Sequence, residues 1–188
     1  MAVQAARKNT GEDWSEKVAS EIAALLELPK HYTELANWQG RSGFDVPSFL
    51  AEKSISLVHG NEWLCGLLEN YDKDKQRSQS DHTFDNVVTV IEKLFPGQQG
   101  SSRSGLCDAG IFGFDALVGN ADRHHQNRGV ILEMKQDGGK AAYSFKLAPT
   151  FDHASSLGRE LTDHSRQRWL RENGIEKYIW KRWHLPPK

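Results

Sequence analysis

The chain has 188 residues, of which 38% are hydrophobic and 26% charged, and its mean hydropathy is -0.64. This length suits one domain spanning residues 1–188, and this composition excludes a membrane protein and a wholly disordered chain. The formal charge of -1 gives no overall electrostatic reason to expect a nucleic-acid partner. Neither a disulfide framework, a cysteine zinc motif nor a signal peptide is visible, so we expect a cytoplasmic protein that does not contact membranes.

The first half of the chain predicts one helix and a hairpin. Apolar residues at helical spacing follow a polar start and predict a helix over about 12–28, which ends before Pro29. Two strand-like runs, 32–38 and 44–50, flank a Gly-rich turn and predict paired strands. The opening MAVQAARK lacks the apolar alternation of a strand.

The second half predicts two helices, a second hairpin and a helical end. Residues 84–95 form an amphipathic pattern, and residues about 104–118 are so apolar that we expect this helix in the middle of the core. Strands through 129–134 and 141–148 predict a β-hairpin with a turn around Gly138. The remainder, 159–183, is expected to be helical, and the end of the chain from residue 159 is basic, with a net charge of +4.

A polar loop after the apolar helix carries the chemistry. Asp122 and Asn127 stand five residues apart, which is the D-x-x-x-x-N spacing of a kinase catalytic loop. A carboxylate there accepts the proton of the acceptor hydroxyl, and an amide oxygen binds Mg²⁺. The hairpin that follows is expected to bring Asp152 back beside Asn127, where it supplies a second oxygen ligand.

Other interpretations of the polar residues were weighed against this one. Asp and Asn in loops often serve only in turns and caps. The pair His124 and His125, with Asp122 and His153 nearby, suggests a transition-metal site, but no metal-binding spacing supports it. Ser155 and Ser156 with His153 as a base suggest a hydrolase, but no nucleophile-elbow motif occurs. His59, His82 and His164 lie among polar residues and are expected at the surface. The basic and aromatic residues of 166–183 suit nucleic-acid binding by stacking, although we favour the explanation that the aromatic rings cover a helical core.

Two sequence stretches resemble the C-terminal catalytic region of HipA-like serine/threonine kinases, which belong to bacterial toxin–antitoxin systems. They are GNADRH continuing to Asn127, and LAPTFDHASS over residues 147–156. The stretch GEDWSEKVASEIA over residues 11–23 is similar to the first large helix of that family. The resemblance covers about residues 9–178, and residues 179–188 form a tail.

The resemblance implies a role for each matching residue. Asp122 would be the catalytic base, His124 would orient the loop, and Asn127 and Asp152 would be the Mg²⁺ ligands. Glu16 would occupy the position of the helix acid that pairs with the nucleotide-binding lysine, for which Lys8 is the nearest candidate. The implied cofactors are ATP and Mg²⁺, and the implied substrate is a protein with a Ser or Thr hydroxyl.

The sequence also departs from the family, because only about 11 residues precede the first helix and no Gly-rich phosphate loop occurs. We therefore expect an α+β, mainly helical fold that corresponds to a kinase-like C-terminal lobe with a reduced or missing N-terminal lobe. The leading function is protein serine/threonine kinase activity, which truncation could have removed. The alternative is a non-catalytic, truncated kinase-like module that binds a partner such as an antitoxin. A separate chain that supplies the N-terminal lobe is a further implied partner.

Overall fold

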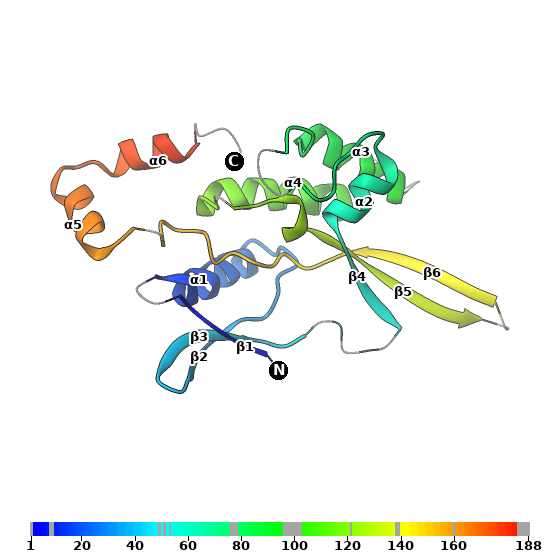
Figure 1. Cartoon of the computed structure of the whole chain (residues 1–188), viewed down its shortest axis with the longest axis horizontal. Helices are drawn as coiled ribbons and strands as arrows, with labels where there is room; N and C mark the ends of the chain where they lie inside the picture. The colour runs from blue at the N-terminus through cyan, green and yellow to red at the C-terminus, as the bar shows by residue number, and fades with distance from the viewer. Residues whose placement is uncertain are drawn as a thin grey trace. The chain divides into compact units, whose positions relative to one another are not determined.

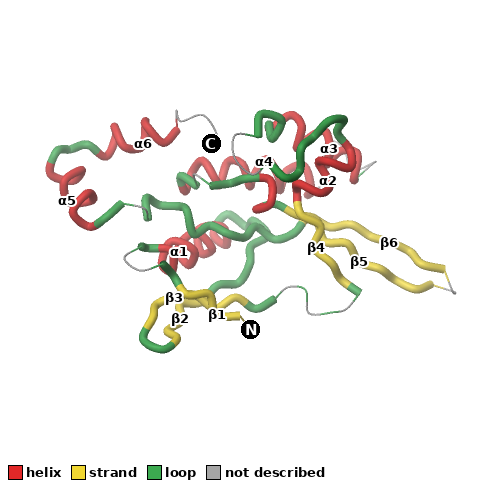
Figure 2. Tube along the Cα trace, viewed as in Figure 1, coloured by secondary structure: helices red, strands yellow, loops and turns green. Residues whose placement is uncertain are grey.

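The computed structural model describes residues 2–7, 10–48, 50, 52, 54–75, 79–95, 103–120, 122–137, 140–159 and 161–183 (Figures 1 and 2). The chain divides into two compact units. The first unit consists of Met1–Ser48, Phe112–Asp122 and Asp152–Lys188, and the second of Phe49–Ile111 and Arg123–Phe151. Each unit contains one small antiparallel sheet, and the described ranges hold six α-helices. The α+β, mainly helical class predicted from the sequence is confirmed.

The first unit is built on a three-stranded antiparallel sheet in the order β1-β3-β2. The strands are β1 (Ala2–Ala5), β2 (Glu34–Trp38) and β3 (Arg41–Val46), and helix α1 (Glu12–Leu25) contacts β2 and β3. Two acidic residues in the first turn of α1 suit the positive end of its dipole. The helix predicted over about 12–28 is confirmed, with an end three residues earlier.

Strand β1 corrects the expectation that the opening residues do not form a strand. Gln4 pairs with Phe44, and Ala5 pairs with Gly43. A Cβ at Gly43 would collide with the carbonyl oxygen of Gln4, so the glycine allows the close approach of β1. The strand depends on a partner 40 residues away in the chain, which a pattern within eight residues does not reveal.

The turn between β2 and β3 is shorter than the sequence suggested. Gln39 and Gly40 both have positive φ, 50° and 73°, which is the geometry of a two-residue hairpin turn. The Asn37 side-chain oxygen accepts a hydrogen bond from the Gly40 N–H at 3.1 Å. Strand β3 therefore begins at Arg41, three residues before the predicted start, and ends before Pro47.

The second unit contains the other three-stranded antiparallel sheet, in the order β4-β5-β6. Its strands are β4 (Ile55–His59), β5 (Gly129–Asp137) and β6 (Lys140–Leu147). The hairpin predicted from the sequence is confirmed as β5 and β6, whereas β4 and the helix after it, α2 (Gly60–Leu67), were not predicted. A short 3-10 helix, η1 (His125–Asn127), contacts both α2 and β4.

The remaining helices agree with the sequence pattern. Helix α3 (Phe84–Leu94) is capped by Thr83, whose hydroxyl accepts a hydrogen bond from the Asn86 N–H at 3.2 Å. Helix α4 (Arg103–Val118) contributes residues to both units. The predicted helical end of the chain consists of α5 (Asp163–Arg171) and α6 (Ile175–Trp183). No helix in the described ranges combines the length and apolar character needed to cross a membrane.

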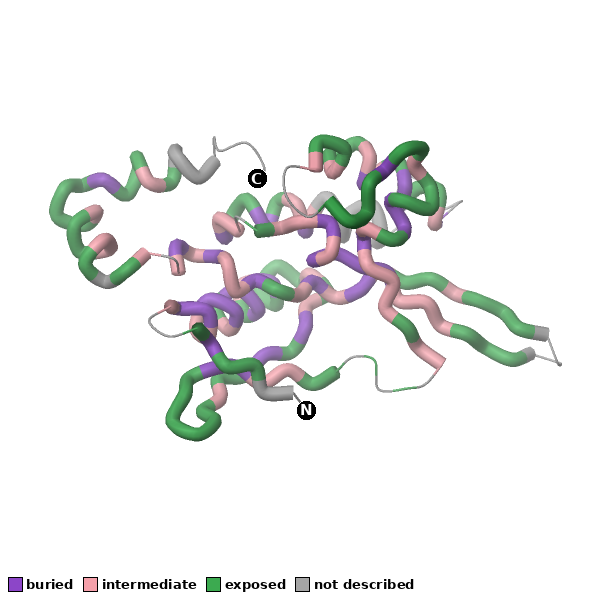
Figure 3. The backbone as a smooth tube through the Cα atoms, viewed as in Figure 1, coloured by how far each residue is buried: buried purple, intermediate pink, exposed green. Residues whose placement is uncertain are grey.

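Both units contain buried residues, and Figure 3 marks them in purple along the backbone. In the first unit, Ala19 and Ala23 of α1 pack with Phe114 and Val118 of α4. Leu117, one residue before Val118, is 61% exposed, so the C-terminal part of α4 is buried along one face only. The expectation that this helix lies fully inside the core is therefore wrong for its last turn. In the second unit the buried apolar residues are Trp63, Leu64, Tyr71, Val87, Val90, Ile91, Phe95, Ile111, Val130 and Ala148.

Candidate functional site

The loop 123–128, which carries part of the predicted kinase residues, forms hydrogen bonds with the rest of the second unit. The Gly60 N–H donates to the Arg128 carbonyl oxygen at 2.9 Å. The His59 ring nitrogen Nδ1 lies 2.8 Å from the Gln126 carbonyl oxygen, and because a carbonyl only accepts, Nδ1 carries the proton. A Cβ at Gly60 would collide with the His125 carbonyl oxygen, so α2 begins as close to this loop as a main chain can approach.

A buried tyrosine holds the side chain of His125. The Tyr71 hydroxyl lies 2.8 Å from His125 Nδ1, and the two side chains are 5% and 1% exposed. Burial lowers the pKa of His125 and raises the pKa of Tyr71, so both groups are neutral at pH 7. The His82 ring lies 5.9 Å from the His125 ring, and its Nε2 atom is buried. The sequence-based placement of His82 at the surface is therefore wrong.

Asn127 is fixed through its own main chain. Asn127 is 8% exposed. Its main-chain N–H donates a hydrogen bond to the His124 carbonyl oxygen at 3.0 Å, and its main-chain carbonyl oxygen accepts one from the Arg123 side chain at 2.6 Å. His124 is half-buried, and its Nδ1 accepts from the Gln126 N–H at 3.3 Å. The loop-orienting role expected of His124 remains a prediction, and this hydrogen bond within the loop is compatible with it.

Asp152 is exposed and has a φ of 59°, in the left-handed region. A non-glycine residue pays a conformational penalty there, and such residues cluster at functional sites. The next residue, His153, is 1% exposed; its ring packs edge-on against Phe114, with ring centroids 5.1 Å apart. Its N–H donates to a Glu16 carboxylate oxygen at 2.6 Å.

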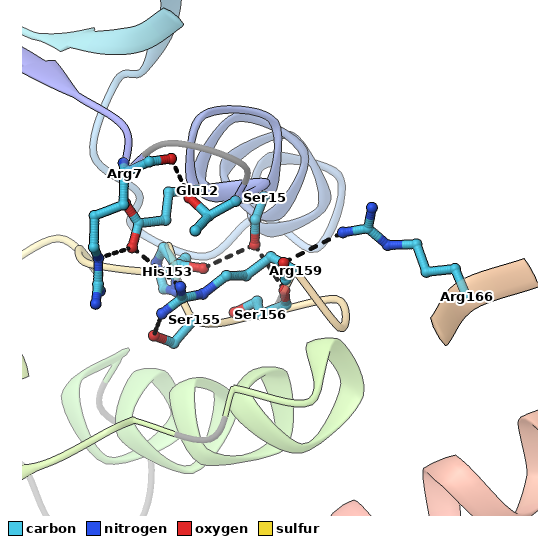
Figure 4. Close-up of polar contacts among 9 residues, drawn as sticks. Arg7, Glu12, Ser15, His153, Ser155, Ser156, Arg159 and Arg166 are labelled. Atoms are coloured by element: carbon cyan, nitrogen blue, oxygen red, sulfur yellow. Dashed lines mark hydrogen bonds and ion pairs between the residues drawn. The ribbon is translucent and has the colours of Figure 1, made fainter. Parts of the chain in front are cut away.

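Helix α1 holds the segment after Asp152 through side chains on its first turns (Figure 4). The Ser15 hydroxyl lies 2.8 Å from the Ser156 carbonyl oxygen and 3.2 Å from that of His153. Glu12 forms an ion pair with Arg159 at 3.1 Å, and Arg159 donates to the Ser155 hydroxyl at 2.8 Å. These contacts fix the backbone from residue 153 to residue 159 against α1.

Asp122 is exposed and follows a turn held by side chains of the first unit. Its N–H donates to the Asn120 side-chain oxygen at 3.1 Å, and the Asn120 side-chain amide donates to Asp115 at 3.2 Å. An exposed carboxylate on a fixed turn suits a proton acceptor for an incoming substrate.

The predicted site residues are distributed over both units. Asp122, Asp152 and Glu16 lie in the first unit, and His124 and Asn127 lie in the second. Lys8 lies outside the described residues, so its pairing with Glu16 stays a prediction, as does the expected juxtaposition of Asn127 and Asp152.

The two predicted metal ligands, Asn127 and Asp152, carry oxygen donors, the type of ligand that Mg²⁺ takes. In the described ranges no group of three or more His, Cys, Asp and Glu side chains could hold a metal ion. Mg²⁺ needs fewer protein ligands, because it takes one or two carboxylates together with substrate phosphates and water. An amide oxygen from Asn127 and a carboxylate from the exposed Asp152 match that requirement.

Several residues that contact the loop or the segment after Asp152 were given no role in the site by the sequence analysis: Arg123, Tyr71, His59 and Ser15. Arg123 lies inside the predicted loop, and a basic residue between two proposed site residues was the one signal available. The other three contact the loop or the segment after Asp152 from 54 to 141 residues away in the chain, for example Tyr71 to His125. No spacing rule identifies such contacts.

Comparison with protein-family models found no match, and comparison with curated proteins found none either. Among solved structures, the chain is similar to the Helicobacter pylori proinflammatory kinase CtkA, with a TM-score of 0.69 and 23% sequence identity. The similarity covers 98% of this chain and 60% of CtkA, so the chain spans about three fifths of that kinase. The fold is therefore kinase-like.

Proposed function

We propose that the chain takes part in phosphoryl transfer from Mg²⁺-ATP to a Ser or Thr hydroxyl of a cytoplasmic protein, as HipA-like kinases do. The observation that carries the proposal is the hydrogen bonding of loop 123–128 on both sides of Asn127, in a chain with a kinase-like fold. The left-handed conformation of Asp152 is compatible with the proposal, because residues in that conformation are more frequent at functional sites.

Each proposed residue has a distinct task. The Asp122 carboxylate accepts the proton of the acceptor hydroxyl as the hydroxyl oxygen bonds to the γ-phosphorus, and the bond from that phosphorus to the β–γ bridging oxygen breaks to leave ADP. Asn127 and Asp152 would hold Mg²⁺ through their side-chain oxygen atoms, and Mg²⁺ bound there would neutralise part of the phosphate charge. Because the protein's contribution is mainly positioning, a rigid loop matters more here than a reactive side chain.

For the nucleotide-clamping half of the site, the sequence offers one candidate lysine and one candidate acid. Lys8 follows strand β1 in the chain, and Glu16 lies on the helix after it, which is the order that the resemblance to HipA-like kinases implies. No Gly-rich phosphate loop occurs in the sequence. Two missing charge-assisted hydrogen bonds, at about 1.5–3 kcal/mol each, would weaken ATP binding on the order of 100-fold or more. We therefore expect weak nucleotide binding by this chain alone and tighter binding with a chain that completes the N-terminal lobe.

Calorimetry with Mg²⁺ and a non-hydrolysable ATP analogue tests the proposal. The wild-type chain should bind with a Kd in the high-micromolar to millimolar range. Asp152→Asn should weaken binding only when Mg²⁺ is present, whereas Asp122→Asn should leave binding nearly unchanged. Asp74→Asn, which alters an exposed loop carboxylate of the second unit, is the control. Equal binding by the wild type and Asp152→Asn would remove Asp152 as a metal ligand.

The alternative proposal is a non-catalytic kinase-like module that binds a protein such as an antitoxin. Nucleotide binding separates the two proposals. If no binding occurs at millimolar ATP, and none appears when a candidate partner chain is added, the kinase proposal is wrong and the module remains.

A further inference from the structure

One guanidinium nitrogen of Arg123 contacts two main-chain carbonyl groups. Its NH1 atom lies 2.6 Å from the Asn127 carbonyl oxygen and 2.6 Å from the Phe151 carbonyl oxygen. A terminal guanidinium nitrogen carries two hydrogens in a fixed plane, so both contacts can be hydrogen bonds at once. Arg123 is half-buried, which limits competition from water for these bonds.

The two carbonyl groups belong to positions that matter for the proposed metal site. One is the carbonyl of Asn127 itself. The other precedes Asp152 directly, because the carbonyl carbon of Phe151 is bonded to the Asp152 nitrogen. A single charged nitrogen thus fixes the main chain at one proposed metal ligand and immediately before the other.

The hairpin does not provide this constraint. Its ladder ends where Val130 pairs with Leu147, followed by one hydrogen bond from the Ala148 N–H to the Gly129 carbonyl oxygen at 3.0 Å. Residues 127 and 151 lie beyond that point on their respective chains. Arg123 therefore links these two residues beyond the end of the ladder.

The conformation of Asp152 explains why such a bridge is needed. Its φ of 59° is unfavourable for a non-glycine residue, so neighbouring groups must hold it. The peptide group after Asp152 donates its N–H to Glu16 at 2.6 Å, and the peptide group before it accepts from Arg123. Both bonds involve a charged partner, which makes them stronger than neutral hydrogen bonds.

We infer that Arg123 is a positioning residue that holds the main chain of Asn127 and Asp152 in the arrangement needed to bind Mg²⁺ with the nucleotide. This inference rests on the proposed function. Arg123 itself contacts neither phosphate nor metal in it. Groups that orient metal ligands typically change metal affinity by about 10- to 100-fold when removed.

The test compares the affinity for a non-hydrolysable ATP analogue with Mg²⁺ and with a chelator. The ratio of these two dissociation constants measures how strongly Mg²⁺ assists binding. Arg123→Met removes both hydrogen bonds at similar length and should reduce that ratio about tenfold or more, with metal-free affinity within about twofold of the wild type. Arg123→Lys keeps the charge and should restore part of the ratio. A role in stability alone would not change metal-assisted and metal-free binding differently.

Arg166→Met is the matched control, because Arg166 also donates to a main-chain carbonyl, that of Arg159 at 3.3 Å, outside the proposed site. It should leave the ratio unchanged. If Arg123→Met folds and its ratio equals that of the wild type, the inference is overturned, but the proposed function still stands. If Arg123→Met does not fold, an unchanged ratio in Arg123→Lys overturns it instead. Absence of Mg²⁺-assisted binding in the wild type would overturn both the inference and the proposed function.

Discussion

Removal of the Glu16 carboxylate should destabilise the protein far more than removal of Glu21 from the same helix. Glu16 is 2% exposed, and its carboxylate accepts the His153 N–H at 2.6 Å. A hydrogen bond to a charged group contributes about 1.5–3 kcal/mol, and the one buried methylene group that truncation removes adds about 0.8 kcal/mol. We therefore expect Glu16→Ala to lower the free energy of unfolding by about 2–4 kcal/mol, and Glu16→Gln by about half as much because it retains a neutral acceptor.

Glu21 provides the control. Its side chain is 51% exposed and pairs with Lys17 at 2.9 Å and Lys30 at 3.3 Å. Exposed ion pairs contribute little to stability, so Glu21→Ala should lower it far less than Glu16→Ala does. Urea unfolding measures the difference, and amide hydrogen exchange at residues 153–157 localises it. Similar losses for both variants, or unchanged exchange at His153 in Glu16→Ala, would refute the claim that α1 holds the segment after Asp152.

Two further predictions concern the second unit. Gly60→Ala should lower the free energy of unfolding, measured in urea, by about 1–3 kcal/mol because the added Cβ collides with the His125 carbonyl oxygen. Gly66→Ala, in the same helix, has free space for the Cβ and should raise the free energy of unfolding by about 0.5–1 kcal/mol. A change of the same sign in both variants would contradict this packing. Burial, followed by the nearby charge of Arg128, lowers the pKa of His82 to about 3. The unfolded chain, with an ordinary pKa of about 6.5, binds the proton first, so the free energy of unfolding should fall as pH decreases from about 6.5 to 3, by at most about 1.4 kcal/mol per pH unit. His82→Gln should flatten this dependence, and an unchanged slope would show that His82 titrates normally.

The elements that the sequence predicted correctly are those with local signals. Helix α3 combines an amphipathic pattern with a Thr83 cap, and the β5 and β6 strands flank a turn sequence. Strands β1 and β4 were missed because each is four or five residues long and depends on pairing with a distant strand. A short run without flanking turn signals has no local feature that distinguishes it from a loop.

The candidate site was accessible from sequence only where its residues share one loop or one hairpin. The spacing of Asp122 and Asn127, and the position of Asp152 after a hairpin, were readable in that way. His82 was placed at the surface because its neighbours in the chain are polar, yet the fold packs its ring against His125. Burial of a histidine in a polar segment results from tertiary packing, which sequence neighbours do not encode.

The most direct test of the proposed metal site is a crystal structure of the chain with Mg²⁺ and a non-hydrolysable ATP analogue. Mg²⁺ binds oxygen at about 2.1 Å, so two ligands of one ion lie no more than about 4 Å apart. The proposed function predicts the Asn127 side-chain oxygen and an Asp152 carboxylate oxygen within that distance, around a metal that also contacts the phosphates. A nucleotide bound elsewhere, or these two oxygens about 10 Å apart or more with the β5–β6 hairpin ordered, would contradict it.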